Sequence, residues 1–212
     1  MELLCKVASE FGEVHSVAPL EKRSGCGHQL TFDRALKFES CGTDCWNVDG
    51  MPADCVRLGV SRLGLFDWVL SGVNDGANLG VDTFISGTVA AAREAMMLGI
   101  PSIAISQYRR GMSSAFDWKA GGKQLQNVLS CLLQLDLSAG RFWNVNLPDG
   151  PENGSNSSGE LVFCESDPSP LPMDYRHDES TSKYSGRYHD RARVSGLDID
   201  NCFSGRISIT MM

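Results

Sequence analysis

The chain has 212 residues, 42% of them hydrophobic, so it can bury a sizeable core as one domain or as one domain with an arm. Its formal net charge of −7 argues against a nucleic-acid-binding protein, which would show a basic stripe. No apolar run reaches the length of a membrane span and the first residues do not form a secretory leader, so we expect a cytoplasmic protein with no membrane contact.

The first half of the chain alternates short helices and strands. Its apolar periodicity and turn residues predict a helix at 1–11, a strand at 13–18, a polar loop at 19–27, antiparallel strands at 29–38 and 45–48, and a helix at 52–63. Pro52 suits the first turn of that last helix, and Asp54 is expected to hold its start in a structural role.

The second half continues the alternation and then changes character. We predict a strand at 66–70, a helix at 88–98, an apolar strand at 100–106, an amphipathic helix at 113–135 and a core strand at 142–147. A flexible linker at 149–159, a strand at 161–164 and an aperiodic segment at 167–190 follow. Apolar strands alternating with helices predict an α/β fold with a doubly wound, mostly parallel, Rossmann-like sheet and a C-terminal β-rich arm.

The eight cysteines do not form a metal-binding or disulfide pattern. There is no C-x-x-C, and the closest pair is Cys41 and Cys45, on either side of a predicted hairpin turn. We therefore expect reduced thiols that pack as small hydrophobes, and no zinc site. Cys26, in a polar loop, is the thiol expected to be exposed and oxidisable.

Residues 70–92 have the composition of an anion-binding loop. A predicted strand leads into residues rich in Gly and Asn, which end at Ser86, Gly87 and Thr88 before an Ala-rich helix. Backbone N–H groups and the dipole at such a helix start favour a bound anion, and glycine lets the backbone approach it. Asn74 and Asn78 offer amide groups to a cation or to phosphate oxygens. The alternative is an ordinary strand–loop–helix connection with a good N-cap.

Several blocks of the sequence, in order and spacing, resemble the survival protein SurE family of metal-dependent phosphatases and nucleotidases. These blocks are VAPLEKRSGCGHQLT (17–31), GMPADCVRLG (50–59), LSGVNDGANLG (70–80), ISGTVAAAREAMMLGIPSIAIS (85–106), FWNVNLP (142–148) and, more weakly, GRISIT (205–210). The resemblance implies a 5'-nucleotidase that hydrolyses nucleoside monophosphates and assembles as a homodimer or homotetramer. It also implies a SurE-like core at 1–148, with the arm at 149–212 making oligomer contacts.

The resemblance assigns roles to particular residues. Ser24 and Asn74 match metal ligands of the family, and the phosphoryl group is held at positions that match Asn78, Ser86, Gly87 and Thr88. Oxygen ligands favour Mg²⁺ or Mn²⁺ over zinc. His28 either protonates a leaving alkoxide or is a hydrogen-bonded loop histidine. Asp75 falls at a variable position and is expected to be solvated, and Met51 stands where the family usually has Thr.

One family feature has no counterpart in the sequence. Members of the family open with a hydrophobic strand ending in Asn-Asp-Asp-Gly, whose carboxylates anchor the cation. This chain opens MELLCKVASEF, which resembles the following helix, and it contains no Asp-Asp pair. We expect an N-terminally shortened form of an active enzyme, itself inactive or impaired. The alternative is a non-catalytic protein that binds nucleotide or phosphate, or that serves in assembly.

Overall fold

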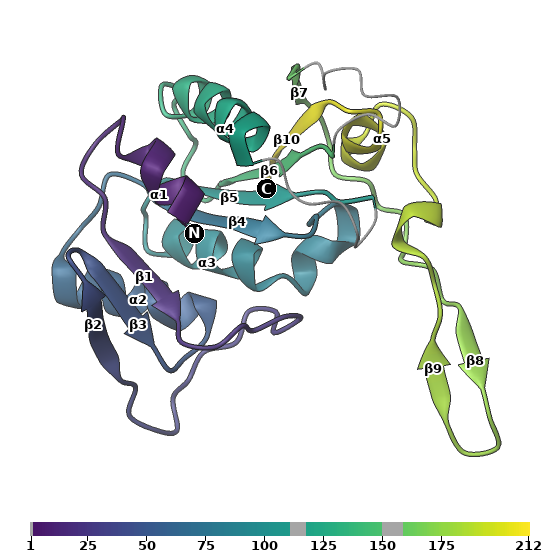
Figure 1. Ribbon diagram of the computed structural model, residues 1–212, viewed down its shortest axis with the longest axis horizontal. Helices are drawn as coiled ribbons and strands as arrows, with labels where there is room; N and C mark the ends of the chain where they lie inside the picture. The colour runs from purple at the N-terminus through teal and green to yellow at the C-terminus, as the bar shows by residue number, and fades with distance from the viewer. Residues whose placement is uncertain (1, 111–117, 150–158) are drawn as a thin grey trace.

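A computed structural model describes residues 2–110, 118–149 and 159–212, with helices on both faces of a larger sheet and a smaller sheet beside it (Figure 1). The larger sheet has the order β4-β5-β6-β10-β7, and the smaller has β1-β3-β2. Pairs β4–β5, β5–β6, β10–β7 and β1–β3 are parallel, whereas β6–β10 and β2–β3 are antiparallel. The predicted α/β class with a mostly parallel sheet is confirmed.

The elements follow the predicted alternation with shifted ends. The strands are β1 (Ser16–Pro19), β2 (Phe38–Gly42), β3 (Cys45–Val48), β4 (Val69–Asp75), β5 (Ser102–Gln107), β6 (Trp143–Leu147), β7 (Leu161–Phe163), β8 (Tyr175–His177), β9 (Ser182–Tyr184) and β10 (Ile207–Met211). The helices are α1 (Glu2–Ala8), α2 (Pro52–Leu63), α3 (Gly87–Met97), α4 (Trp118–Leu132) and α5 (Asp198–Phe203), with 3-10 turns η1 (Gly80–Phe84) and η2 (Tyr188–Asp190). The part of the predicted 113–135 helix before residue 118, and residues 150–158 of the predicted linker, lie outside the described residues.

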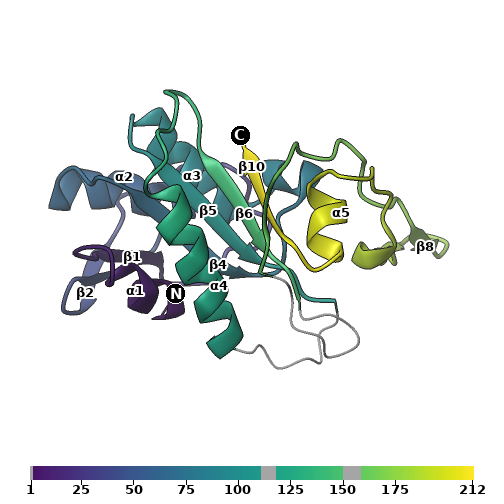
Figure 2. The ribbon, with the colours of Figure 1, turned by 90° about the horizontal axis from the view of Figure 1, so that it is seen from above.

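The main core lies on the face of the larger sheet that α1 and α4 cover. Alternate residues of β5, β6 and β10 point to this face, because successive strand residues face opposite sides. They pack against the apolar stripe of α4 that includes Leu125 and Leu129, and against Leu4 and Val7 of α1. Figure 2 shows α4 over these strands and α5 beside β10. On the opposite face, Val89 of α3 and neighbouring apolar residues form a smaller cluster.

The C-terminal residues contribute two strands, β7 and β10, to the larger sheet and also form a separate hairpin. β10 lies between β6 and β7, and the antiparallel hairpin β8–β9 projects from the body (Figure 1). The hairpin lies in the predicted β-rich arm, within the segment that showed no strand periodicity, whereas α5 was not predicted. Within the described ranges, no helix combines the length and the apolar character needed to cross a bilayer.

Two predictions for the smaller sheet are wrong. The strand predicted at 29–38 does not form before Phe38, because side-chain bonds replace a ladder: Asp49 accepts from the backbone N–H of Lys37 at 2.8 Å and from Arg34 Nη1 at 3.0 Å. The expectation of reduced thiols fails at Cys41 and Cys45, which form a disulfide. Their Cα atoms lie 5.3 Å apart across the hairpin, within the span that a disulfide bridges.

Candidate functional site

A cavity of about 940 Å³ lies between the two sheets. Its walls come from β1 and β4, with residues of α1, α2 and the start of α3. Within the described part of the chain, β1 is one of the two edge strands of the smaller sheet and β4 is one of the two edge strands of the larger sheet. The cavity is therefore bounded by two strand edges that each lack a neighbour on the cavity side, which is the arrangement that accepts an additional strand.

The polar residues singled out in the sequence line this cavity. The lining includes all six candidate ligands, namely Ser24, Asn74, Asn78, Ser86, Gly87 and Thr88. They come from the loop after β1, from the end of β4 and the loop that follows it, and from the start of α3. Ligands of parallel α/β sheets bind at the carboxyl ends of the strands, and these residues lie at or after the carboxyl ends of β1 and β4.

The start of α3 is capped and closely packed. Ser86 Oγ accepts a hydrogen bond from the backbone N–H of Val89 at 3.1 Å, so its hydroxyl hydrogen remains available to donate. A Cβ added at Gly87 would lie 2.7 Å from Cys26 Sγ and 3.0 Å from Pro52 Cγ. Glycine at this position therefore lets the loop that carries Ser24 pack directly against the helix start.

Asn74 owes its position to a close approach of β4 to β5. Gly72 has φ +141°, and a Cβ there would lie 2.3 Å from the carbonyl oxygen of Ile105. The pairing register with β5 shifts between Ser71 and Asn74, and this irregularity changes the direction in which the side chains at the end of β4 point. Asn74 Nδ2 donates to the carbonyl of Gly76 at 2.7 Å, so the amide oxygen is the atom left to contact a ligand.

Asn78 is buried and fixed from three sides. Its Nδ2 donates to Ser106 Oγ at 2.6 Å, and its backbone N–H donates to Asn146 Oδ1 at 2.8 Å. Its carbonyl accepts from Asn144 Nδ2 at 2.9 Å and Asn146 Nδ2 at 3.0 Å. The buried polar side chains of β5 and β6 therefore hold Asn78 in one orientation at the cavity wall.

His28 lies in an ion-pair cluster that the sequence analysis did not identify. Its Nε2 lies 2.7 Å from Oε2 of Glu94, a fully buried carboxylate of α3. Arg57 Nε of α2 lies 2.5 Å from Oε1 of the same carboxylate. The geometry matches the hydrogen-bonded alternative for His28. A signal for Glu94 was present, because it follows Ala90 and Ala91 at helical spacing on the buried face of α3.

Two other sequence expectations are confirmed. Asp54 accepts from the backbone N–H of Met51 at 2.8 Å and from the hydroxyl of Thr31 at 2.7 Å, so it holds the start of α2 and the loop before it. Asp75 is exposed and its Oδ1 lies 2.9 Å from Arg109 Nη1. Asp54 is therefore committed to structural hydrogen bonds, whereas Asp75 is a lining residue of the cavity and pairs with Arg109.

The residues described do not on their own fit a divalent cation. Ser24 and Asn74 supply only neutral oxygen donors, whereas Mg²⁺ and Mn²⁺ sites rely on carboxylates. Across residues 2–110, 118–149 and 159–212, no group of three or more His, Cys, Asp or Glu side chains is placed to hold a metal. The site as described offers neutral donors of the kind that an anion requires and is incomplete for a cation.

Comparison with known proteins agrees with this architecture. The chain is 44% identical over 196 residues to a Nostoc sp. protein named "Putative 5'-nucleotidase alr3139", a match covering 92% of this chain and 85% of that protein. It is 41% identical over 148 residues to the 5'-nucleotidase SurE of Neisseria gonorrhoeae, covering 69% of this chain and 58% of that one. The crystal structure of SurE from Aquifex aeolicus matches with a TM-score of 0.85 and 29% identity, covering 100% of this chain and 86% of that chain. The model of the Survival protein SurE family matches residues 1–163, and the chain therefore belongs to the SurE family.

Proposed function

We propose that this chain belongs to a phosphomonoesterase that hydrolyses nucleoside monophosphates, and that it supplies the phosphate-binding half of the site. The observation that carries the proposal is that Asn78, Ser86, Gly87 and Thr88 all line the same cavity. The relatives named as 5'-nucleotidases support the choice of substrate class.

The donors at this end suit the equatorial oxygens of a phosphoryl group. Ser86 and Thr88 carry hydroxyls, and the first backbone N–H groups of α3 point out of a helix whose dipole adds positive partial charge. Such fixed donors stabilise the charge that develops on phosphoryl oxygens without reorganising during the reaction. The site can thus attract an anion even though the chain carries a net negative charge.

The cation that we propose is Mg²⁺ or Mn²⁺, held by Ser24 and Asn74 only when carboxylates from outside the described residues join them. The SurE family is metal-dependent, and its motif at this place is an apolar strand ending in Asn-Asp-Asp-Gly. The cavity between β1 and β4 has the two unpaired edges that such a strand needs. We therefore propose that residues 1–212 alone hydrolyse little or no substrate.

The test compares the chain with a version extended at its N-terminus by an apolar strand ending in Asn-Asp-Asp-Gly. A matched control carries Asn-Asn-Asn-Gly, which fills the same cavity without charge. We expect Mn²⁺-dependent hydrolysis of AMP only with the Asp-containing extension, and its loss in Asn74→Ala. Equal activity of all three proteins, surviving Asn74→Ala, would contradict the proposal.

The second candidate function is a non-catalytic nucleotide- or phosphate-binding or assembly protein. It is favoured by one observation: the candidate phosphate-binding residues line one cavity, while the described residues include no group of three or more metal-ligating side chains. Binding of AMP with the same affinity in the presence of Mn²⁺ and of a chelator, with no hydrolysis by the extended protein, would select this function.

We further propose that residues 1–148 form the catalytic core and that 149–212 contribute contacts in a homodimer or homotetramer in the cytoplasm. The projecting hairpin supports this role, because Tyr175 and Tyr184 are exposed and pack edge to face with ring centroids 5.4 Å apart. Light scattering on the chain and on a variant with both tyrosines changed to Ser tests it. Loss of the oligomer only in the variant is the expected result.

A further inference from the structure

The loop between β4 and α3 depends on distant residues for its shape. It carries Asn78 at one end and Ser86 at the other, with the 3-10 turn η1 between them. Inside the turn, the hydroxyl of Thr83 donates to the carbonyl of Gly80 at 2.9 Å, and the backbone N–H of Asp82 donates to the carbonyl of Leu79 at 3.1 Å. A single 3-10 turn has strained hydrogen bonds and little stability of its own.

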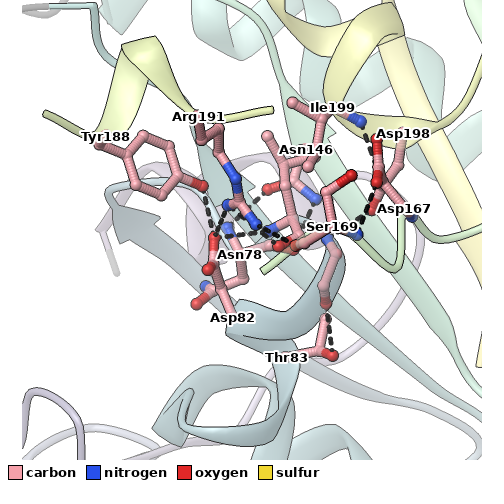
Figure 3. Close-up of polar contacts among 12 residues, drawn as sticks. Asn78, Asp82, Thr83, Asn146, Asp167, Ser169, Tyr188, Arg191, Asp198 and Ile199 are labelled. Carbon is pink, nitrogen blue, oxygen red and sulfur yellow. Dashed lines mark hydrogen bonds and ion pairs between the residues drawn. The ribbon is translucent and has the colours of Figure 1, made fainter. Parts of the chain in front are cut away.

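The first external anchor is a buried ion pair to Asp82 (Figure 3). Arg191 Nη1 lies 2.8 Å from Asp82 Oδ2, and the exposed fractions of the two side chains are 0% and 8%. The hydroxyl of Tyr188 donates to the same oxygen at 2.5 Å. The guanidinium also lies over the Tyr188 ring, with its Cζ 5.2 Å from the centroid. Burial raises the pKa of Tyr188, so the hydroxyl stays protonated and donates across the ordinary pH range.

The second external anchor is Asp198 at the start of α5 (Figure 3). Its Oδ2 accepts from the backbone N–H of Gly80 at 2.8 Å, and its Oδ1 accepts from the backbone N–H groups of Asp167 and Ile199 at 2.8 Å each. Gly80 has φ +55°, and a Cβ there would lie 2.5 Å from the carbonyl oxygen of Asp167. The turn thus packs closely against the backbone of Asp167 and is hydrogen-bonded to the buried carboxylate of Asp198.

We propose that Arg191 and Tyr188 are positioning residues for phosphate binding, acting through Asp82. By fixing the middle of the turn they set the separation of Asn78 from the Ser86–Thr88 helix start. This inference rests on the proposed function, because it concerns the loop assigned there to the phosphoryl group. It adds that residues more than a hundred positions later in the chain control the affinity of that loop.

The test uses two readouts on the whole chain: hydrogen exchange of the backbone amides of Asp82 and Ile85, and the dissociation constant for inorganic phosphate. In Arg191→Gln we expect about tenfold faster exchange at these amides and about tenfold weaker phosphate binding, because the charge-assisted bond to Asp82 is lost. The amides of β5 should exchange as in the original chain. Arg193→Gln is the matched control, since it removes the same charge from an exposed position two residues later. The Arg193 guanidinium lies over the Phe203 ring.

Two further variants guard against simple misfolding. Tyr188→Phe keeps the ring under the guanidinium and removes only the donor to Asp82, so a smaller acceleration at the same amides is expected. Arg191→Lys restores the charge and should recover part of the phosphate affinity. The proposal is overturned if Tyr188→Phe and Arg191→Gln both behave like Arg193→Gln. That result means equal exchange rates at the two loop amides and an equal dissociation constant for phosphate. If the original chain binds no phosphate, the proposed function fails. The exchange rates of the loop amides then still show whether Arg191 and Tyr188 hold the turn through Asp82.

Discussion

Replacing Glu94 by Gln tests whether a buried carboxylate joins α2, α3 and the loop after β1. Glu94 is fully buried, and its two oxygens each meet a basic side chain, His28 at 2.7 Å and Arg57 at 2.5 Å. Gln keeps the shape, removes the charge, and turns an amide N–H₂ group toward one of the two donors. The change therefore weakens both contacts without opening a cavity.

The expected loss follows from the exposure of the two partners. A hydrogen bond to a charged group contributes about 1.5–3 kcal/mol. We assign this range to the His28 contact, because the His28 side chain is only 19% exposed. The Arg57 side chain is 48% exposed and can turn to water, so its contact contributes only about 0–1 kcal/mol. The sum is a loss of about 1.5–4 kcal/mol in the free energy of unfolding. Each kcal/mol lowers the Tm by roughly 2–4 °C in a chain of this size.

Urea and thermal unfolding followed by circular dichroism measure this loss. Glu39→Gln is the matched control, because Glu39 is exposed on β2 and its replacement should leave the unfolding free energy unchanged within about 0.5 kcal/mol. If Glu94→Gln behaves like Glu39→Gln, the carboxylate does not hold the junction and the reasoning is refuted. A change in the urea m-value would instead point to an altered denatured state.

Three further outcomes are expected. Gly72→Ala should lower the unfolding free energy by at least about 2 kcal/mol by chemical denaturation, because its Cβ would strike the carbonyl of Ile105, whereas Gly99→Ala meets no atom within 4 Å and should cost less. Asp49 has its pKa lowered by the hydrogen bond that a backbone amide donates to it, so it stabilises the fold above its unfolded pKa of 3.8 and loses that contribution as the pH falls through the lower folded value. Asp49→Asn should thus be less stable than the original chain at about pH 6, and the difference should shrink in acid when unfolding is measured across pH. Burial raises the pKa of Cys55 to about 12, so this thiol should resist a disulfide reagent at pH 8 until urea unfolds the chain, and rapid labelling without urea would contradict its placement.

Local sequence signals predicted the elements whose own residues specify them. The helix predicted at 52–63 was placed correctly at both ends, since Pro52 fixes its first turn and Asp54 bonds back to its start. The start of α3 followed from Ser86, whose side chain caps the helix. The loops that bring Ser24, Asn74 and the phosphate-loop residues to one cavity followed from strand order, because carboxyl ends of parallel strands meet at one edge.

The elements that the sequence did not reveal are held by partners far along the chain. α5 has only six residues, and its first residue, Asp198, bonds to Gly80 rather than to its own helix alone. The anchoring of Asp82 by Arg191 leaves no periodic trace, because the two residues meet only through the tertiary fold. The hairpin β8–β9 is exposed on both strands, so it lacks the alternation of apolar and polar residues that marks a half-buried strand.

A ligand that contacts both sheets links its affinity to the relative arrangement of the sheets. Ser24 belongs to the loop that leaves the smaller sheet, whereas Asn74 ends a strand of the larger one, so a ligand that contacts both must find the sheets in a single relative arrangement. Its observed affinity is then the intrinsic affinity scaled by the fraction of molecules in that arrangement. By the same linkage, such a ligand at a hundred times its dissociation constant adds about 2.7 kcal/mol to the stability of the joined form. Substitutions in the packing of α2 against α3, remote from any ligand atom, would accordingly change binding constants without touching a binding residue.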